Sequence, residues 1–124
     1  MDYRCITNTS SSQYKLQQLA YTNDKGLRKI DNDYCVALGT YYTSGCGERF
    51  EIVLGNGNSF TVIVSDVKDD AHTDVTNRYN PSNGNVVEFI VDTDSLHSNI
   101  RRDGSIGSYD EFSGSVISIE KIEG

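Results

Sequence analysis

The sequence predicts a mainly-β protein: a small closed β-barrel of about six strands with one or two short helices. Segments with alternating apolar and polar residues recur along the chain and are separated by turns rich in glycine and asparagine. No strand–helix–strand rhythm is present. Because so few strands would leave unpaired edges in a sandwich, a closed barrel is the favoured architecture.

Length and charge limit the functional classes. The 124 residues are enough for one core. We expect residues 1–33 to be an N-terminal extension with a short helix and turns, and residues 34–124 to be the barrel domain. The net charge of −7 makes nucleic acid an unfavourable partner. No apolar run approaches the roughly 20 residues that cross a bilayer, and no signal peptide is recognisable, so no membrane span is expected.

The pattern at 48–65 predicts a β-hairpin. Residues 48–54 alternate, with Phe50, Ile52 and Leu54 on the inward side. Gly-Asn-Gly-Asn at 55–58 tolerates the positive φ of a hairpin turn, and residues 60–65 form the returning strand.

The other elements follow from shorter patterns. A helix is predicted at 11–21, where Ser11 or Ser12 provides the N-cap, and a second short helix at 93–101. Further strands are expected at 27–30, 34–42, 86–91 and 113–122. Residues 68–85 form a long polar loop, and a loop of this length in a small domain is often functional.

Two carboxylates are the candidate catalytic residues. Asp66 ends the returning strand of the hairpin, and Glu88 lies in the middle of the apolar run VVEFIVD. Apolar surroundings would disfavour the charged form of Glu88 and suit it to act as a general acid on a glycosidic bond. Asp66 would stabilise the developing positive charge on the sugar. The alternatives are an exposed or ion-paired Glu88 and an Asp66 that only accepts backbone N–H groups.

Four further residues are candidate substrate contacts. Aromatic rings can stack on sugar faces, which points to Tyr41, Tyr42 and Tyr79, although ordinary packing explains tyrosines equally well. Asp69 is the fourth candidate, and a solvated acidic loop is the alternative reading of its surroundings.

No metal and no cofactor are expected. The acidic stretch DDAHTD at 69–74 does not have the spacing of a calcium loop, and its single histidine is weak support for zinc. Cys35 could form a disulfide with Cys46 or be a small buried residue, and the odd number of cysteines weakens the disulfide reading. A peptidase pair of Cys35 and His72 is a minor alternative.

The order of four motifs resembles a known family. CVALG, GERFEIVL, FTVIVSDVKDD and VVEFIVD, within roughly residues 34–92, resemble the double-psi β-barrel domains of cell-wall-active proteins. Similar domains are the three-aspartate domain, the stationary-phase-survival muralytic proteins and the barrel of the membrane-bound lytic transglycosylase A family. Similar stretches occur in phage and prophage proteins of Gram-positive bacteria.

The resemblance implies roles for both carboxylates. Asp66 matches the acidic position after the hairpin, and Glu88 matches the catalytic aspartate. The chain departs from the family at two points: Val67-Lys68-Asp69 replaces the family's Thr-Gly-Gly, and the catalytic position is Glu rather than Asp.

The implied function is cleavage of peptidoglycan, of the lytic transglycosylase type, by a carboxylate acid/base without a cofactor. Its expected partners are peptidoglycan glycan strands, with other domains of a larger wall-associated or phage protein as further candidates. The expected location is extracellular, at the cell wall or in a phage virion. The alternative is a non-catalytic module with the same barrel fold that binds glycan or serves a structural role in a phage or wall assembly.

Overall fold

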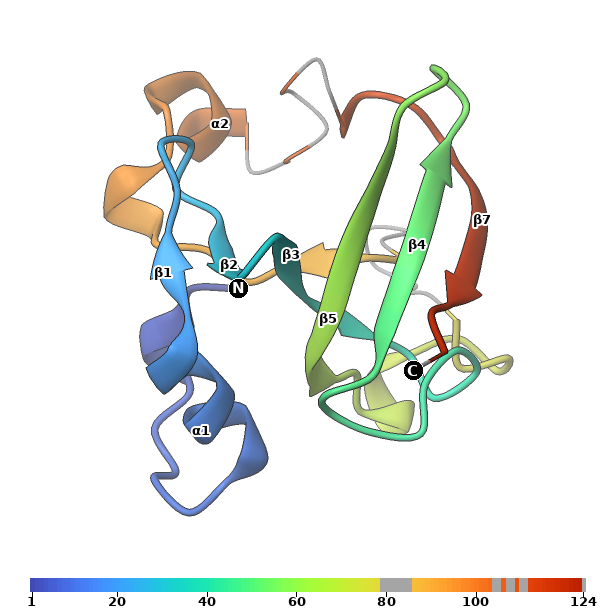
Figure 1. Ribbon diagram of the computed structural model, residues 1–124, viewed down its shortest axis with the longest axis horizontal. Coiled ribbons are helices and arrows are strands. Elements are labelled where there is room, and N and C mark those ends of the chain that lie inside the picture. Colours follow the sequence, from blue (N-terminus) through green and yellow to red (C-terminus); the bar gives the residue numbers. More distant parts are fainter. Residues whose placement is uncertain (79–85, 104–105, 107–108, 110–111, 124) are drawn as a thin grey trace.

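The computed structural model describes residues 1–78, 86–103, 106, 109 and 112–123 and has a mainly-β fold (Figure 1). Its elements are a mixed seven-stranded sheet and two α-helices. The strands are β1 (Tyr21–Thr22), β2 (Arg28–Ile30), β3 (Asp33–Leu38), β4 (Arg49–Leu54), β5 (Ser59–Val67), β6 (Glu88–Phe89) and β7 (Val116–Lys121). The helices are α1 (Ser12–Leu19) and α2 (Ser98–Asp103), with 3₁₀ turns η1 (Tyr3–Cys5), η2 (Asp70–His72) and η3 (Thr93–Ser95).

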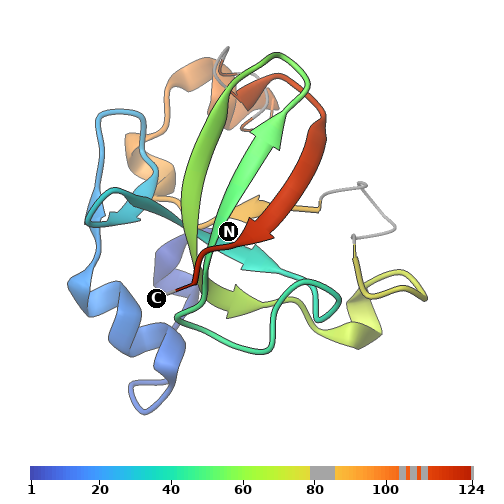
Figure 2. The same cartoon turned by 45° about the vertical axis from the view of Figure 1, so that its right-hand side comes forward.

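The sheet is organised around β3. Its strand order is β1-β2-β3-β5-β4-β7, and β6 pairs with β3 outside this path (Figure 2). Among the described strands, every pairing is antiparallel except that of β3 with β5, which is parallel. The sheet has seven strands rather than the expected six because residues 21–22 pair with β2. Since β2 also pairs with β3, residues 1–33 are joined to the rest of the chain by sheet hydrogen bonds.

The predicted hairpin is confirmed as β4 and β5. Phe50, Ile52 and Leu54 are buried, whereas Glu51 on the opposite face is exposed. Gly57 has a φ of 90° in the turn, a value that glycine reaches without steric cost. Local alternation and turn chemistry therefore determine this part of the fold.

One face of the sheet packs four aromatic rings, which we call the aromatic cluster. Its members are Tyr34, Phe60, Phe89 and Phe112. Every pair of these rings is in contact, with centroids 4.9 to 5.9 Å apart. Most contacts are edge-to-face, an arrangement that adds to the stabilisation from burying the rings.

The other face carries a smaller second cluster of Ile30, Cys35, Ile63 and Ile90. Helix α1 covers it with Leu16. The helix begins as predicted, because the Ser11 hydroxyl accepts a hydrogen bond from the Tyr14 backbone N–H at 3.1 Å.

Arg28 forms hydrogen bonds with the carboxyl-terminal end of α1. Its guanidinium donates to the backbone oxygens of Gln17 and Ala20 at 3.0 and 3.3 Å and to Gln17 Oε1 at 3.0 Å. It also lies 4.1 Å from the ring centroid of Tyr3. These bonds satisfy carbonyl groups that the end of a helix leaves without partners.

Several expected elements differ in extent, three of them clearly. The strand expected at 34–42 ends at Leu38, and the strand expected at 86–91 is reduced to two residues, Glu88–Phe89. The helix expected at 93–101 is divided into η3 and α2, because Asp92 caps the first turn separately. Among the described residues, no helix is long and apolar enough to cross a bilayer.

Candidate functional site

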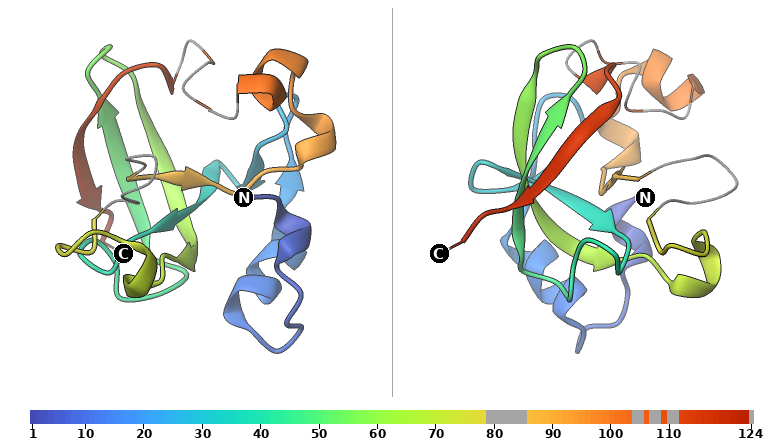
Figure 3. Two further views of the ribbon diagram at one scale, coloured as in Figure 1. Left: turned by 180° about the vertical axis from the view of Figure 1, so that it is seen from behind. Right: turned by 90° about the vertical axis from the view of Figure 1, so that its right-hand side faces the viewer.

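The candidate residues lie at the carboxyl ends of β3 and β5. These strands are parallel, so the loops that follow them, residues 39–47 and 68–78, emerge at the same end of the sheet (Figure 3, right). Glu88 begins β6, which runs antiparallel to β3, so it lies at this end too. The topology thus gathers residues that are more than 20 positions apart in the sequence.

Asp66 and Glu88 flank the same residue of β3. Ala37 pairs with Asp66 on one side and with Glu88 on the other. Residues that pair directly across a sheet point to the same face, so the two carboxylates share a face on either side of a small methyl group. Two strand spacings place their Cα atoms about 10 Å apart.

A β-bulge creates this arrangement. Val36 pairs with Val64, but the next residue, Ala37, pairs with Asp66, so Ser65 is an extra residue in β5. Strict alternation would place Asp66 on the face of Val64, which belongs to the larger core with the aromatic cluster. The bulge turns Asp66 to the face of Glu88, and such bulges are common beside active sites.

Asp66 makes two hydrogen bonds. Its Oδ1 accepts from the backbone N–H of Val67 at 3.0 Å and from Nε2 of Gln13 in α1 at 3.3 Å. The backbone bond is the one expected of a structural carboxylate at a strand end. The side chain remains half-buried, beside the N-terminal turn of α1.

The surroundings of Glu88 differ from the apolar pocket that its sequence neighbours suggested. Its side chain is 41% exposed and lies 3.9 Å from Nζ of Lys68 and 3.6 Å from the amino group of Met1. Val87 and Phe89 pack on the opposite face, with the larger core. A strand residue within an apolar stretch of sequence is therefore not necessarily surrounded by apolar atoms, because adjacent side chains lie on opposite faces of the sheet.

Lys68 is a site residue that the sequence did not reveal. Its side chain is only 6% exposed, and its backbone N–H donates to the Leu38 carbonyl at 2.9 Å. Burial lowers the pKa of Lys68, and the nearby Glu88 carboxylate opposes that effect. The available signal was its spacing: Lys68 follows Asp66 by two positions and so continues the same face of the strand.

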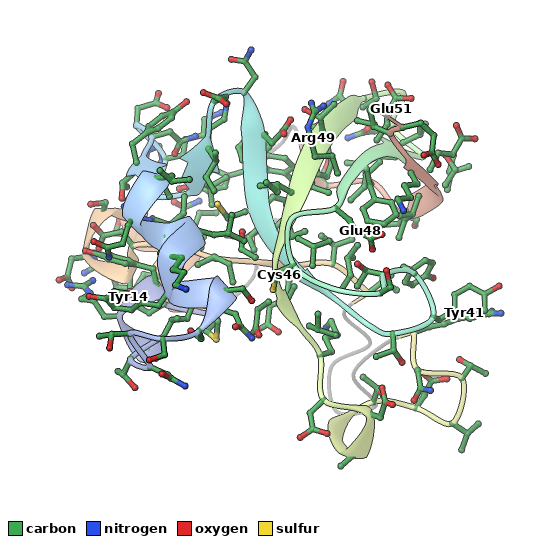
Figure 4. All side chains as sticks on the ribbon, turned by 60° about the horizontal axis from the view of Figure 1, so that its bottom comes forward. Tyr14, Tyr41, Cys46, Glu48, Arg49 and Glu51 are labelled. Atoms are coloured by element: carbon green, nitrogen blue, oxygen red, sulfur yellow. The ribbon has the colours of Figure 1, made fainter. Side chains whose placement is uncertain are left out.

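Tyr41 and Tyr42 differ in accessibility. Tyr41 is 57% exposed and projects from the loop after β3 (Figure 4). Tyr42 is half-buried, packs against the larger core, and burial raises its pKa. The guanidinium of Arg78 lies 3.9 Å from the Tyr41 ring centroid. Tyr41 is therefore the tyrosine of this pair that is free to meet a ligand, and Tyr79 lies outside the described residues.

Asp69 serves the loop. Its carboxylate accepts from the backbone N–H of Ala71 at 2.9 Å and caps η2. The side chain of Asp69 is exposed at the same end of the sheet as Asp66. A substrate-binding role is compatible with this position.

The cysteines are free in the structure. Cys35 is fully buried, which supports the reading of a small core residue. Burial raises the pKa of the Cys35 thiol, the opposite of what an activated nucleophile needs. Cys46 lies close to β5 in the loop after β3, and burial raises its pKa as well (Figure 4). Within the described ranges, no three His, Cys, Asp or Glu residues are grouped to hold a metal ion.

No protein-family model, curated protein or solved structure matches this chain.

Proposed function

We propose that this chain is a peptidoglycan-cleaving domain of the lytic transglycosylase type, with Asp66 and Glu88 as its working carboxylates. The observation that carries the proposal is the pairing of both residues with Ala37, which sets two carboxylates on one face of the sheet. Two carboxylates on either side of a glycosidic bond are what acid/base cleavage of a sugar polymer requires.

The proposed chemistry divides the roles. Glu88 protonates the glycosidic oxygen and then accepts the proton of the C6 hydroxyl of N-acetylmuramic acid, which closes the 1,6-anhydro ring without water. Asp66 stabilises the positive charge that develops on the sugar ring.

The ion pair of Glu88 with Lys68 supports a second candidate function. Because Glu88 is 41% exposed and lies beside Lys68, it has the environment of a charged surface residue. This favours a module of the same fold that binds glycan or serves as a structural part of a wall or phage assembly without cleaving the polymer. Turnover is the property that separates the two candidates.

The proposal includes the finer fold and the location. A double-psi β-barrel is supported by the parallel pairing of β3 with β5 and by the position of β6 beside β3. The domain would act outside the cell, at the Gram-positive wall or as part of a phage particle, alone or beside other domains.

Digestion of purified Gram-positive peptidoglycan, with products identified by mass spectrometry, tests the proposal. We expect products that end in 1,6-anhydro-muramic acid. Glu88→Gln should abolish them, and Asp66→Asn should lower their rate by at least about 100-fold, as losses of acid/base or charge-stabilising groups do. Lys15→Gln, an exposed change on α1, should leave the rate unchanged.

Three outcomes contradict parts of the proposal. Products with reducing ends would mean hydrolysis by an activated water. Turnover by Glu88→Gln would mean that the acid is another residue. Sedimentation with the wall in the absence of any product would establish the second candidate instead.

A further inference from the structure

The exposed pair of Arg78 and Tyr41 lies at the same end of the sheet as the candidate carboxylates. We propose that this pair is the subsite that binds a carboxylate group of the glycan: the lactyl carboxylate or a stem-peptide carboxylate carried by every second sugar of peptidoglycan. The inference rests on the proposed function and adds to it the feature by which the site would distinguish peptidoglycan from neutral polysaccharides.

The stacking geometry leaves the binding edge of Arg78 available. Its guanidinium carbon lies over the Tyr41 ring at 3.9 Å from the centroid, a distance at which a guanidinium plane commonly stacks on an aromatic face. The N–H groups point outward in that plane, where they can donate two parallel hydrogen bonds to a carboxylate. Arg78 is exposed, and in the parts of the chain that the structure describes no salt bridge engages its guanidinium.

The two loops that carry the pair are fastened to each other. Tyr41 donates its backbone N–H to the Asn77 carbonyl at 3.2 Å, and the Thr40 hydroxyl donates to the Asp70 carboxylate at 2.7 Å. Gly39 makes the approach possible, because a Cβ at this position would lie 2.1 Å from the Asn77 oxygen.

The loop after β5 is also fixed internally just before Arg78. Asp74 accepts from the backbone N–H of Arg78 at 2.8 Å and from that of Thr76 at 3.0 Å. The Thr73 hydroxyl donates to Asn77 Oδ1 at 3.2 Å. Arg78 and Tyr41 are thus held in place before any ligand arrives, which lowers the entropic cost of binding.

The charge around the pair gives Arg78 its selectivity. Among the described residues, the same end of the sheet carries six carboxylates: Glu48, Asp66, Asp69, Asp70, Asp74 and Glu88. The other cations that the structure describes here each lie beside a carboxylate: Lys68 and the Met1 amino group beside Glu88, and Lys121 beside Glu48. Arg78 is exposed, and no described salt bridge engages it. An anionic polymer would be repelled by most of this surface and attracted at Arg78. Arg78 would therefore hold a carboxylate of the polymer at a fixed position while the sugar chain contacts Asp66 and Glu88.

Calorimetric titration with three glycans tests this inference, using the inactive Glu88→Gln protein as the background. Chitin oligosaccharides carry no carboxylate. Amidase-treated peptidoglycan strands keep only the lactyl carboxylate, and intact strands carry the peptide carboxylates. We expect Arg78→Gln to weaken binding of at least one carboxylate-bearing glycan by about tenfold, the order expected for one charged hydrogen bond, and to leave chitin binding unchanged.

Matched variants separate charge from packing. Lys15→Gln removes an exposed positive charge elsewhere and should have no effect on any glycan. Arg78→Lys keeps the charge without the planar fork and should restore only part of the affinity. Tyr41→Ala removes the ring that the Arg78 guanidinium contacts and should weaken binding of the carboxylate-bearing glycans.

The results discriminate among the possibilities. A loss confined to amidase-treated strands identifies the lactyl carboxylate, and a loss confined to intact strands identifies the peptide. An equal loss for chitin, or no loss for either acidic glycan, overturns the inference while leaving the proposed function standing. If the parent protein binds none of the three glycans, the proposed function fails and the inference fails with it.

Discussion

The two faces of the sheet at β3 have different compositions. On one face, Tyr34 and three phenylalanines form the aromatic cluster, within a core of large apolar side chains. On the other face, the second cluster has four small or aliphatic members. Buried polar groups accompany it under α1 and at the end of β5: Gln17, Arg28, Ser65 and Lys68.

The difference separates stability from function. Burying aromatic rings stabilises the fold, whereas burying polar groups costs free energy unless their hydrogen bonds are made. Gln17 Nε2 is buried without a hydrogen-bond partner in the described part of the chain. Asp66 and Glu88 lie on this polar face. We therefore expect the aromatic face to dominate the free energy of unfolding and the polar face to carry the activity.

The largest expected effect on stability compares Phe89 and Ile90, adjacent residues whose side chains lie on opposite faces of the sheet. Phe89→Ala should lower the free energy of unfolding by about 3–5 kcal/mol, because it removes a ring that contacts all other members of the aromatic cluster. Ile90→Val, on the second face, should lower it by about 0.5–1.5 kcal/mol. Denaturant unfolding measures both, and losses of equal size would refute a dominant aromatic face.

A smaller effect is expected from Arg28, one of the buried cations of the polar face. Arg28→Met should cost about 1–3 kcal/mol, because the Gln17 and Ala20 carbonyls lose their donors while remaining partly buried. Lys15→Met removes the same charge from an exposed position of α1 and should change stability by less than about 0.5 kcal/mol. If Arg28→Met were as stable as the parent, the bonds under α1 would contribute no net stability.

The smallest expected effect is on the pH dependence of stability, and it comes from Lys68. Its folded pKa lies below the unfolded value of 10.5, so between those two values the unfolded chain binds more protons. Parent stability should therefore rise relative to Lys68→Met as pH increases from neutral toward 10.5. Chemical unfolding of both proteins across this range measures the difference. Parallel curves would show that the Lys68 ammonium is not destabilised by its burial.

The sequence was sufficient where local rules decide the outcome. The β4–β5 hairpin and the start of α1 at Ser11 follow from alternation, turn residues and a capping hydroxyl, all within a few positions. The strand expected at 86–91 was less well predicted. Its apolar composition does not show that the ladder with β3 covers only Glu88 and Phe89, nor that Ile90 then bonds both Cys35 of β3 and Arg28 of β2.

The candidate site was predictable in its residue types but not in its geometry. Asp66 and Glu88 stand out because each follows or interrupts an apolar strand pattern. Alternation alone assigns Asp66 to the face of Val64, away from Glu88, and the bulge at Ser65 reverses that assignment. Lys68 and Arg78 were overlooked because they lie in a polar stretch whose contacts come from distant segments.

The sequence by itself determined a mainly-β chain, the hairpin at its centre and the carboxylates that are candidates for chemistry. These depend on interactions between residues close in the chain, for which periodicity and turn preference are direct signals. Tertiary structure decided that β3 and β5 run parallel, that Ala37 lies between Asp66 and Glu88, and that Arg78 stacks on Tyr41. The physical reason is that strand register, bulges and loop contacts are set by packing between segments far apart in sequence, which no local pattern encodes.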